Sequence, residues 1–169
     1  APCFMEDMPV LIPFGVDQDP HFRITRDVAP KINKPKPALI HNIMIPALGG
    51  PKGKMSASNE NETIYTTDPP ETVKKKINKY AFSGGQPDIE EHRKKGGNPD
   101  IDVSYQYLRI FFEPDDKKLK QIHDDYKSGK MLTGELKEIL IQKINNFLKS
   151  HQEKRESAKS QIDKFLYKD

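Results

Sequence analysis

One segment of the sequence, GGPKGKMSAS at residues 49–58, combines the residue types best suited to binding a polyphosphate. Glycines let the backbone approach a ligand closely, lysines supply positive charge, and serine hydroxyls donate hydrogen bonds. Lys54, Ser56 and Ser58 are therefore candidate binding or catalytic residues on a flexible loop, whose mobility would serve a reaction cycle. The alternative interpretation is a solvated basic turn, because a glycine- and lysine-rich loop alone is a weak signal.

A second candidate site is GVDQ at residues 15–18. It follows an apolar run, residues 9–16, that is typical of a buried strand, and it precedes a segment with Pro20 where a first helical turn accepts proline. In α/β proteins this order places ligand-binding groups at the carboxyl end of a strand. Asp17 has two open interpretations, a polar ligand group or a cap of the following helix.

The pattern of the sequence changes near residue 67. Before this point, apolar segments and a short stretch at residues 62–68 predict strands, with one helix between them. After it, apolar residues recur at helical spacing, and Thr133 is the expected cap of a long last helix that becomes solvated between residues 150 and 161. We therefore expect an α/β region over residues 1–66 and an all-α region over residues 67–169.

Composition excludes several classes of protein. With 28 Lys and Arg against 25 Asp and Glu in 169 residues, the net charge of +3 does not by itself indicate a nucleic-acid partner. A single cysteine, Cys3, cannot form an intrachain disulfide and favours a reducing compartment. We see no signal peptide, no membrane-spanning apolar run, and no metal-binding spacing among the five histidines, so a cytoplasmic location is expected.

Beyond these two motifs, successive segments resemble the carboxyl-terminal half of a eukaryotic or archaeal tryptophanyl-tRNA synthetase, a class I aminoacyl-tRNA synthetase. KMSAS is similar to the class I signature loop, and GVDQ is similar to the Gly-x-Asp-Gln motif of the tryptophan and tyrosine enzymes. The resemblance runs from Pro9 to about Gln152 and includes AFSGG at residues 81–85 and LTGELK at residues 132–137. The sequence DQDPHFRITRD at residues 17–27 resembles the tryptophan enzyme more than its tyrosine relative.

The resemblance implies a fold and an activity. Residues 1–66 would form the second half of a Rossmann-type nucleotide-binding domain, and residues 67–169 would form a helical anticodon-binding domain. The family joins tryptophan to ATP, releases pyrophosphate, and transfers the aminoacyl group to tRNA(Trp). It uses Mg²⁺ held by the phosphates, without a protein metal site, and it acts as a homodimer.

The resemblance also implies roles for individual residues. Lys54, Ser56 and Ser58 would stabilise the charge that develops on pyrophosphate, and Met55 would anchor the loop or face adenine. Ala57 stands where many relatives carry a second lysine, a departure that the eukaryotic tryptophan enzymes share. The upstream motif would bind ATP through Gly15, Asp17 and Gln18, and Gln18 would also face tryptophan.

For the anticodon contacts, fewer positions of this chain match the residues of the family. After AFSGG the family often has arginine followed by a polar or acidic residue, whereas this chain has Gln86 and Pro87. Because proline cannot donate a hydrogen bond, only Gln86 and Asp88 remain as candidates there. Lys137 matches a lysine that the family directs at the anticodon; its alternative interpretation is an ordinary exposed lysine.

The HxGH-type element of class I enzymes is absent from the sequence, as is most of the tryptophan pocket that the family places before residue 9. We therefore expect this chain to be a fragment that is inactive alone, with residues missing between Phe4 and Met5. Two alternatives stay open: a non-catalytic fragment or homologue that binds tRNA or a protein, and a relative of the tyrosyl enzyme.

Overall fold

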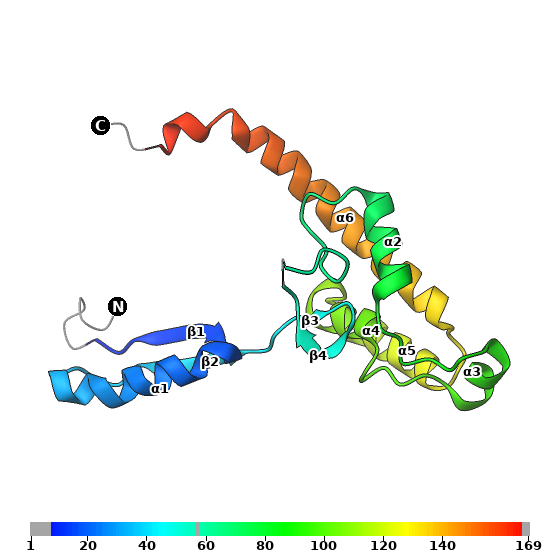
Figure 1. Cartoon of the computed structure of the whole chain (residues 1–169), viewed down its shortest axis with the longest axis horizontal. Coiled ribbons are helices and arrows are strands. Elements are labelled where there is room, and N and C mark those ends of the chain that lie inside the picture. Colours follow the sequence, from blue (N-terminus) through cyan, green and yellow to red (C-terminus); the bar gives the residue numbers. More distant parts are fainter. Residues whose placement is uncertain (1–7, 57, 167–169) are drawn as a thin grey trace. The chain divides into compact units, whose positions relative to one another are not determined.

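The computed structural model describes residues 8–56 and 58–166, which divide into two compact units between Met44 and Ile45 (Figure 1). The expectations about Cys3 and about the junction of Phe4 and Met5 fall outside the described residues.

The first unit is a β-α-β arrangement. Strand β1 (Leu11–Gly15) pairs in parallel with β2 (Ala38–Asn42), from Leu11 opposite Ala38 to Gly15 opposite Asn42. Between them lie the 3₁₀ turn η1 (Val16–Gln18), helix α1 (Asp19–Val28) and the 3₁₀ turn η2 (Ala29–Ile32). The predicted strand, and the helix with proline in its first turn, are confirmed.

The core of this unit is a small aromatic cluster. Phe14 is the one buried residue of β1, and its ring lies 4.4 Å from that of Phe22 and 4.7 Å, edge to face, from that of His41. Other apolar side chains of the unit, such as those of Leu11 and Ile24, are exposed. The prediction that this run forms a buried strand is thus correct for the strand and wrong for most of its side chains.

The second unit begins with an antiparallel ribbon. Strand β3 (Pro46–Ala47) pairs with β4 (Gly50–Lys54), so the first part of the expected flexible loop is a strand rather than an irregular segment. The short strand predicted at residues 62–68 is wrong: these residues form turns. They are held by side chains: the Thr63 hydroxyl donates to the Ser56 carbonyl, and the Asp68 carboxylate accepts from the Tyr65 N–H within the same segment.

Helices make up the rest of the second unit. They are α2 (Pro70–Tyr80), α3 (Ile89–Lys95), α4 (Val103–Tyr107) with its π-helical continuation η3 (Leu108–Phe112), α5 (Asp116–Lys127), α6 (Thr133–Lys159) and the 3₁₀ turn η4 (Ile162–Lys164). α6 is the long helix that Figure 1 shows beside α2. Its end is solvated as expected, since residues 153–160 are exposed.

These helices enclose one hydrophobic core, whose burial is their main source of stability. Its members come from every long helix and from the ribbon, and are Leu48, Val73, Ile77, Ala81, Val103, Tyr105, Tyr107, Leu108, Ile122, Tyr126, Leu136, Leu140, Ile141, Ile144 and Leu148. Tyr107 also ties the core to the ribbon, because its hydroxyl donates to the carbonyl of Pro46 at 2.7 Å.

The helix starts use aspartate caps, as local sequence chemistry favours. Asp88, Asp102 and Asp115 accept backbone N–H groups at the starts of α3, α4 and α5. Thr133 does not cap α6, because its hydroxyl is engaged by Ser83 and Tyr126. Glu135 replaces it by accepting from the backbone N–H of Leu132 at 2.6 Å.

The order of elements agrees with the expected α/β region followed by an all-α region. The two compact units divide after residue 44. The domain boundary expected near residue 67, where the sequence pattern changes from strand-like to helical, stays a prediction. Over the described part of the chain, no helix combines the length and the apolar character needed to cross a bilayer.

Candidate functional site

The GVDQ turn sits where β1 passes into α1. A side chain at Gly15 would place its Cβ 3.0 Å from the Asp17 carboxylate and 3.3 Å from the sulfur of Met44, so this position is closely packed. Gln18 occupies the N-cap position of α1 but makes no capping hydrogen bond through its side chain, which is exposed. The structure thus brings Gly15, Asp17 and Gln18 together in one turn at the carboxyl end of a parallel strand.

Asp19 fixes this turn to the second strand. Its carboxylate accepts from Arg23 at 2.6 Å and lies 2.9 Å from Nε2 of His41 on β2. Burial alone would raise the pKa of Asp19, but the hydrogen bonds from Arg23 and His41 outweigh it and lower the pKa. A charged Asp19 therefore holds the start of α1 against β2, next to the candidate residues.

KMSAS begins at the end of β4. The Met55 N–H donates to the Ile45 carbonyl at 3.0 Å, and its half-buried side chain packs against the hydrophobic core, as expected of an anchor. Ser56 and Ser58 are exposed, with their hydroxyl oxygens 3.2 Å apart. Of Lys54 the structure describes the backbone, while its side chain and all of Ala57 lie outside the described part.

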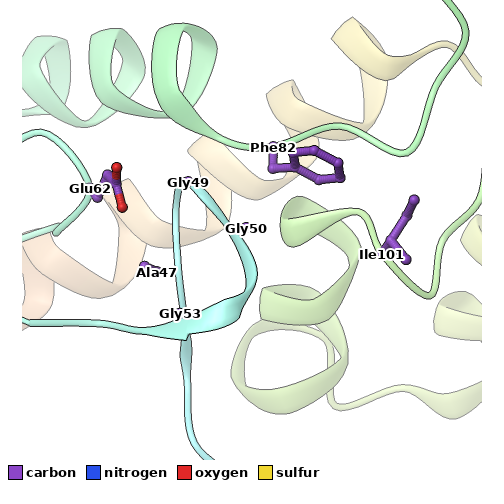
Figure 2. A pocket seen from close by; sticks show the side chains of 7 residues that line it. All are labelled: Ala47, Gly49, Gly50, Gly53, Glu62, Phe82 and Ile101. Atoms are coloured by element: carbon purple, nitrogen blue, oxygen red, sulfur yellow. The ribbon is translucent and has the colours of Figure 1, made fainter.

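A hollow of about 450 Å³ lies beside this ribbon (Figure 2). Its lining consists of Ala47, Gly49, Gly50, Gly53, Glu62, Phe82 and Ile101. Glu62 lies against the ribbon, because a Cβ on Gly49 would come within 2.7 Å of its carboxylate. The sequence pattern gave no sign of Glu62, since it precedes no helix and belongs to no motif.

The residues that follow the AFSGG turn help to line another hollow of about 450 Å³ among the helices of the second unit. It is lined by Gln86, Pro87, Asp88, Ile89, His92 and the first residues of α6, Leu132 to Glu135. The Gln86 amide donates to the carbonyl of Gly96 at 3.0 Å, and Asp88 caps α3 by accepting from Glu91 at 2.7 Å. The two predicted anticodon residues therefore share one surface.

Lys137 does not line this hollow. Only 9% of it is exposed, and its ammonium donates to the carbonyl of Asn78 at 3.2 Å. Burial lowers the pKa of Lys137, and the charge of Asp102 opposes that change in part. The interpretation of Lys137 as an ordinary exposed lysine is therefore wrong.

Asp102, in the interior of the second unit, holds the AFSGG turn by a hydrogen bond. It is fully buried, and one carboxylate oxygen accepts from the Gly84 N–H at 2.9 Å and from the Tyr126 hydroxyl at 2.8 Å. Burial, together with the charge of Asp102, raises the pKa of Tyr126 to about 12. The surrounding backbone is tight: a Cβ on Gly84 would lie 2.0 Å from the Asn98 carbonyl, and one on Gly97 would lie 2.5 Å from the Tyr126 ring.

Among the residues that the structure describes, no three His, Cys, Asp or Glu side chains come together in a group able to hold a metal ion. His92, for instance, is buried between Tyr126, at a ring distance of 5.2 Å, and the carbonyl of Met131, at 2.9 Å. That the phosphates of a bound nucleotide hold Mg²⁺ stays a prediction.

A parallel β-α-β unit with GVDQ at its strand end, followed by KMSAS on a ribbon before a helical unit, is the arrangement of a class I synthetase. The family model for class I tRNA synthetases (W and Y) matches residues 3–149. The chain belongs to this family, and its fold is the expected Rossmann-type segment followed by a helical domain.

Individual relatives support this family assignment. The chain is 58% identical to the tryptophan–tRNA ligase of Sulfurisphaera tokodaii over 99% of its length. It is 54% identical to the cytoplasmic tryptophan–tRNA ligase of Homo sapiens over 94% of its length. A crystal structure of a product-bound parasite tRNA synthetase superimposes with a TM-score of 0.85 and 51% identity, covering 90% of this chain.

The chain spans 44% of the archaeal relative, 33% of the human relative and 40% of the parasite structure. What those proteins do as wholes therefore enters here as a proposal.

Proposed function

We propose that the protein is a cytoplasmic tryptophan–tRNA ligase, which activates tryptophan with ATP to the adenylate and transfers it to tRNA(Trp). The observation that carries the proposal is the 58% identity, over 99% of this chain, to a protein named as such a ligase. The complete GVDQ and KMSAS motifs support catalysis, because a module that only binds RNA has no need of them.

Activation produces negative charge on departing pyrophosphate, so the protein must place donors and cations where that charge forms. Lys54 is the cation proposed for this role, and the exposed hydroxyls of Ser56 and Ser58 are its neighbouring donors. The ribbon supports them because Met55, the next residue, is fixed to Ile45 through its backbone and to the core through its side chain.

The GVDQ turn is proposed to bind the nucleotide and the amino acid. Gly15 would admit the ribose, Asp17 would bind a polar group, and the exposed amide of Gln18 would reach tryptophan or the nucleotide. ATP with Mg²⁺ is the proposed nucleotide, with the metal held by phosphate oxygens. The proposed assembly is a homodimer that binds tRNA across both subunits.

The helical unit is proposed to bind the anticodon, as the domain of residues 67–169. Gln86 and Asp88 share one hollow, so both can reach the same nucleotide. Lys137 is buried, and we propose that its positive charge attracts the RNA from the protein interior, without a direct contact. Base edges and phosphates are the groups that such amide, carboxylate and ammonium side chains recognise.

The test is ATP–pyrophosphate exchange by the complete protein, with tryptophan compared against tyrosine, followed by aminoacylation of tRNA(Trp). Exchange that depends on tryptophan supports the proposal, and exchange that depends on tyrosine assigns the tyrosyl specificity instead. Binding of tRNA with neither exchange would identify a non-catalytic binding protein.

A further inference from the structure

A buried polar cluster lies directly behind the KMSAS segment, in the same compact unit. Lys76 on α2, only 9% exposed, donates to the carbonyl of Thr63 at 2.8 Å and to the carboxylate of Asp68 at 2.7 Å. Its ammonium also lies 4.6 Å from the centre of the Tyr65 ring. The three N–H groups of the lysine thus face a carbonyl, a carboxylate and an aromatic face.

Thr63 connects this cluster to the motif. It is itself only 6% exposed, and its hydroxyl donates to the carbonyl of Ser56 at 2.6 Å. The Asn59 N–H donates to the same carbonyl at 3.2 Å. Two hydrogen bonds therefore connect α2 to KMSAS: one from Lys76 to the Thr63 carbonyl, and one from the Thr63 hydroxyl to the Ser56 carbonyl.

The Ser56 side chain, in contrast, is exposed, and within residues 8–56 and 58–166 its hydroxyl bonds to Ser58. Packing therefore does not fix this side chain, and two tethers from outside the turn hold the backbone in addition to the local bond from Asn59. One is the Met55 N–H on the Ile45 carbonyl, and the other is the Thr63 hydroxyl on the Ser56 carbonyl. Removing the second tether would leave the Ser56 carbonyl with the local bond from Asn59 and without its link to Thr63 and α2.

We propose that Thr63 is a positioning residue for adenylate formation: it holds the Ser56 carbonyl so that the KMSAS donors meet the pyrophosphate, and Lys76 holds Thr63. The proposal rests on the proposed ligase function. Positioning of this kind matters because small misplacements of reacting groups cost large factors in rate. It acts on the transition state, so kcat should change and ground-state binding of tryptophan should not.

The experiment measures tryptophan-dependent ATP–pyrophosphate exchange in the complete protein for wild type, Thr63→Val and Thr63→Ser. Valine keeps the shape of threonine and removes the donor, while Ser56 keeps its bond from Asn59, so no buried carbonyl is orphaned. We expect Thr63→Val to lower kcat about tenfold, with tryptophan affinity unchanged, since one hydrogen bond is worth about this factor. Thr63→Ser, which restores the hydroxyl, should return kcat to within about twofold of wild type.

Thr67→Val is the matched control, because Thr67 lies in the same segment and is exposed. If Thr63→Val does not fold, Thr63→Cys carries the test, since a thiol is a weak donor of similar size. Wild-type kcat in the folded variant, or an equal loss in Thr63→Ser or Thr67→Val, would overturn the proposal. Absence of exchange in wild type would instead refute the ligase function itself.

Discussion

The buried carboxylate of Asp102 offers the sharpest test of how the helical unit is held together. One of its oxygens accepts from the Ser104 and Tyr105 N–H groups at 2.8 and 3.3 Å, which caps α4. The other accepts from Gly84 and Tyr126. All four groups donate to one carboxylate. In Asp102→Asn, an NH₂ group replaces one of the two oxygens and therefore faces two donors without accepting from either.

The size of the effect follows from these contacts. With the amide facing Gly84, Tyr126 can still use Thr133, 3.1 Å from its hydroxyl, but the Gly84 N–H loses its acceptor. A hydrogen bond to a charged group is worth about 1.5–3 kcal/mol, and a donor left without a partner adds to the loss. We therefore expect the free energy of unfolding to fall by about 3 kcal/mol, and the melting temperature by about 9 °C for a chain of this size.

Urea unfolding followed by circular dichroism at the helical signal measures this change. Asp100→Asn is the matched control, because Asp100 lies two residues away and is exposed, so it should change stability by less than about 0.5 kcal/mol. Equal stability of Asp102→Asn and Asp100→Asn would refute the reasoning, since it would mean that the four contacts contribute nothing net.

Three further predictions concern the site and its pH dependence. Lys54→Ala should slow tryptophan-dependent exchange about a hundredfold and leave tryptophan binding nearly intact, because the lysine acts on charge formed in the transition state. Gln86→Ala should weaken tRNA binding several-fold, roughly the worth of one or two hydrogen bonds, without changing exchange. Burial alone would raise the pKa of Glu113, but its hydrogen bond with Lys143, at 2.9 Å, lowers it below the ordinary 4.5. This lowered pKa stabilises the fold above about pH 4.5 and ceases to do so as pH falls further, so Glu113→Gln should flatten the acid limb of the stability profile.

Each of these predictions has a contradicting result. Equal loss of exchange and of tryptophan binding would remove Lys54 from its role. Gln121→Ala, on the exposed side of α5, is the control for Gln86, and equal effects on tRNA binding would exclude a specific contact. Glu138→Gln is the exposed control for Glu113, and an acid limb that Glu113→Gln leaves unchanged would show that the pair with Lys143 is not responsible.

Local signals predicted much of the fold. Two predicted helices were correct because their signals depend only on neighbouring residues. The signals are Pro20 in the first turn of α1, and the 3.6-residue spacing of Leu136, Leu140 and Ile144 on α6. The ribbon at Gly50–Lys54 was missed because its glycines indicate a loop, whereas pairing with β3 and the bond from Tyr107 to Pro46 form only in the tertiary structure.

The candidate site was predicted only as far as its motifs extend. Thr63 bonds to Ser56 of KMSAS, and Lys76 in turn bonds to Thr63. Neither charge nor spacing separates Lys76 from the lysines that adjoin it on α2. Burial makes the difference, and burial depends on which face of α2 packs against the loop. The assignments of Gly15, Asp17, Gln18 and the KMSAS residues to ligands stay predictions.

The glycines around Tyr126 limit where the helical unit can change by mutation. A single methyl group at Gly84 or Gly97 would collide with a carbonyl or with the tyrosine ring, so these positions do not accept side chains without rebuilding the turn. Gln86 to Asp88, in contrast, line a hollow, although Gln86 also bonds to the Gly96 carbonyl and Asp88 caps α3. A substitution at residues 86–88 would therefore change the lining of the hollow, while a side chain at either glycine would displace the turn.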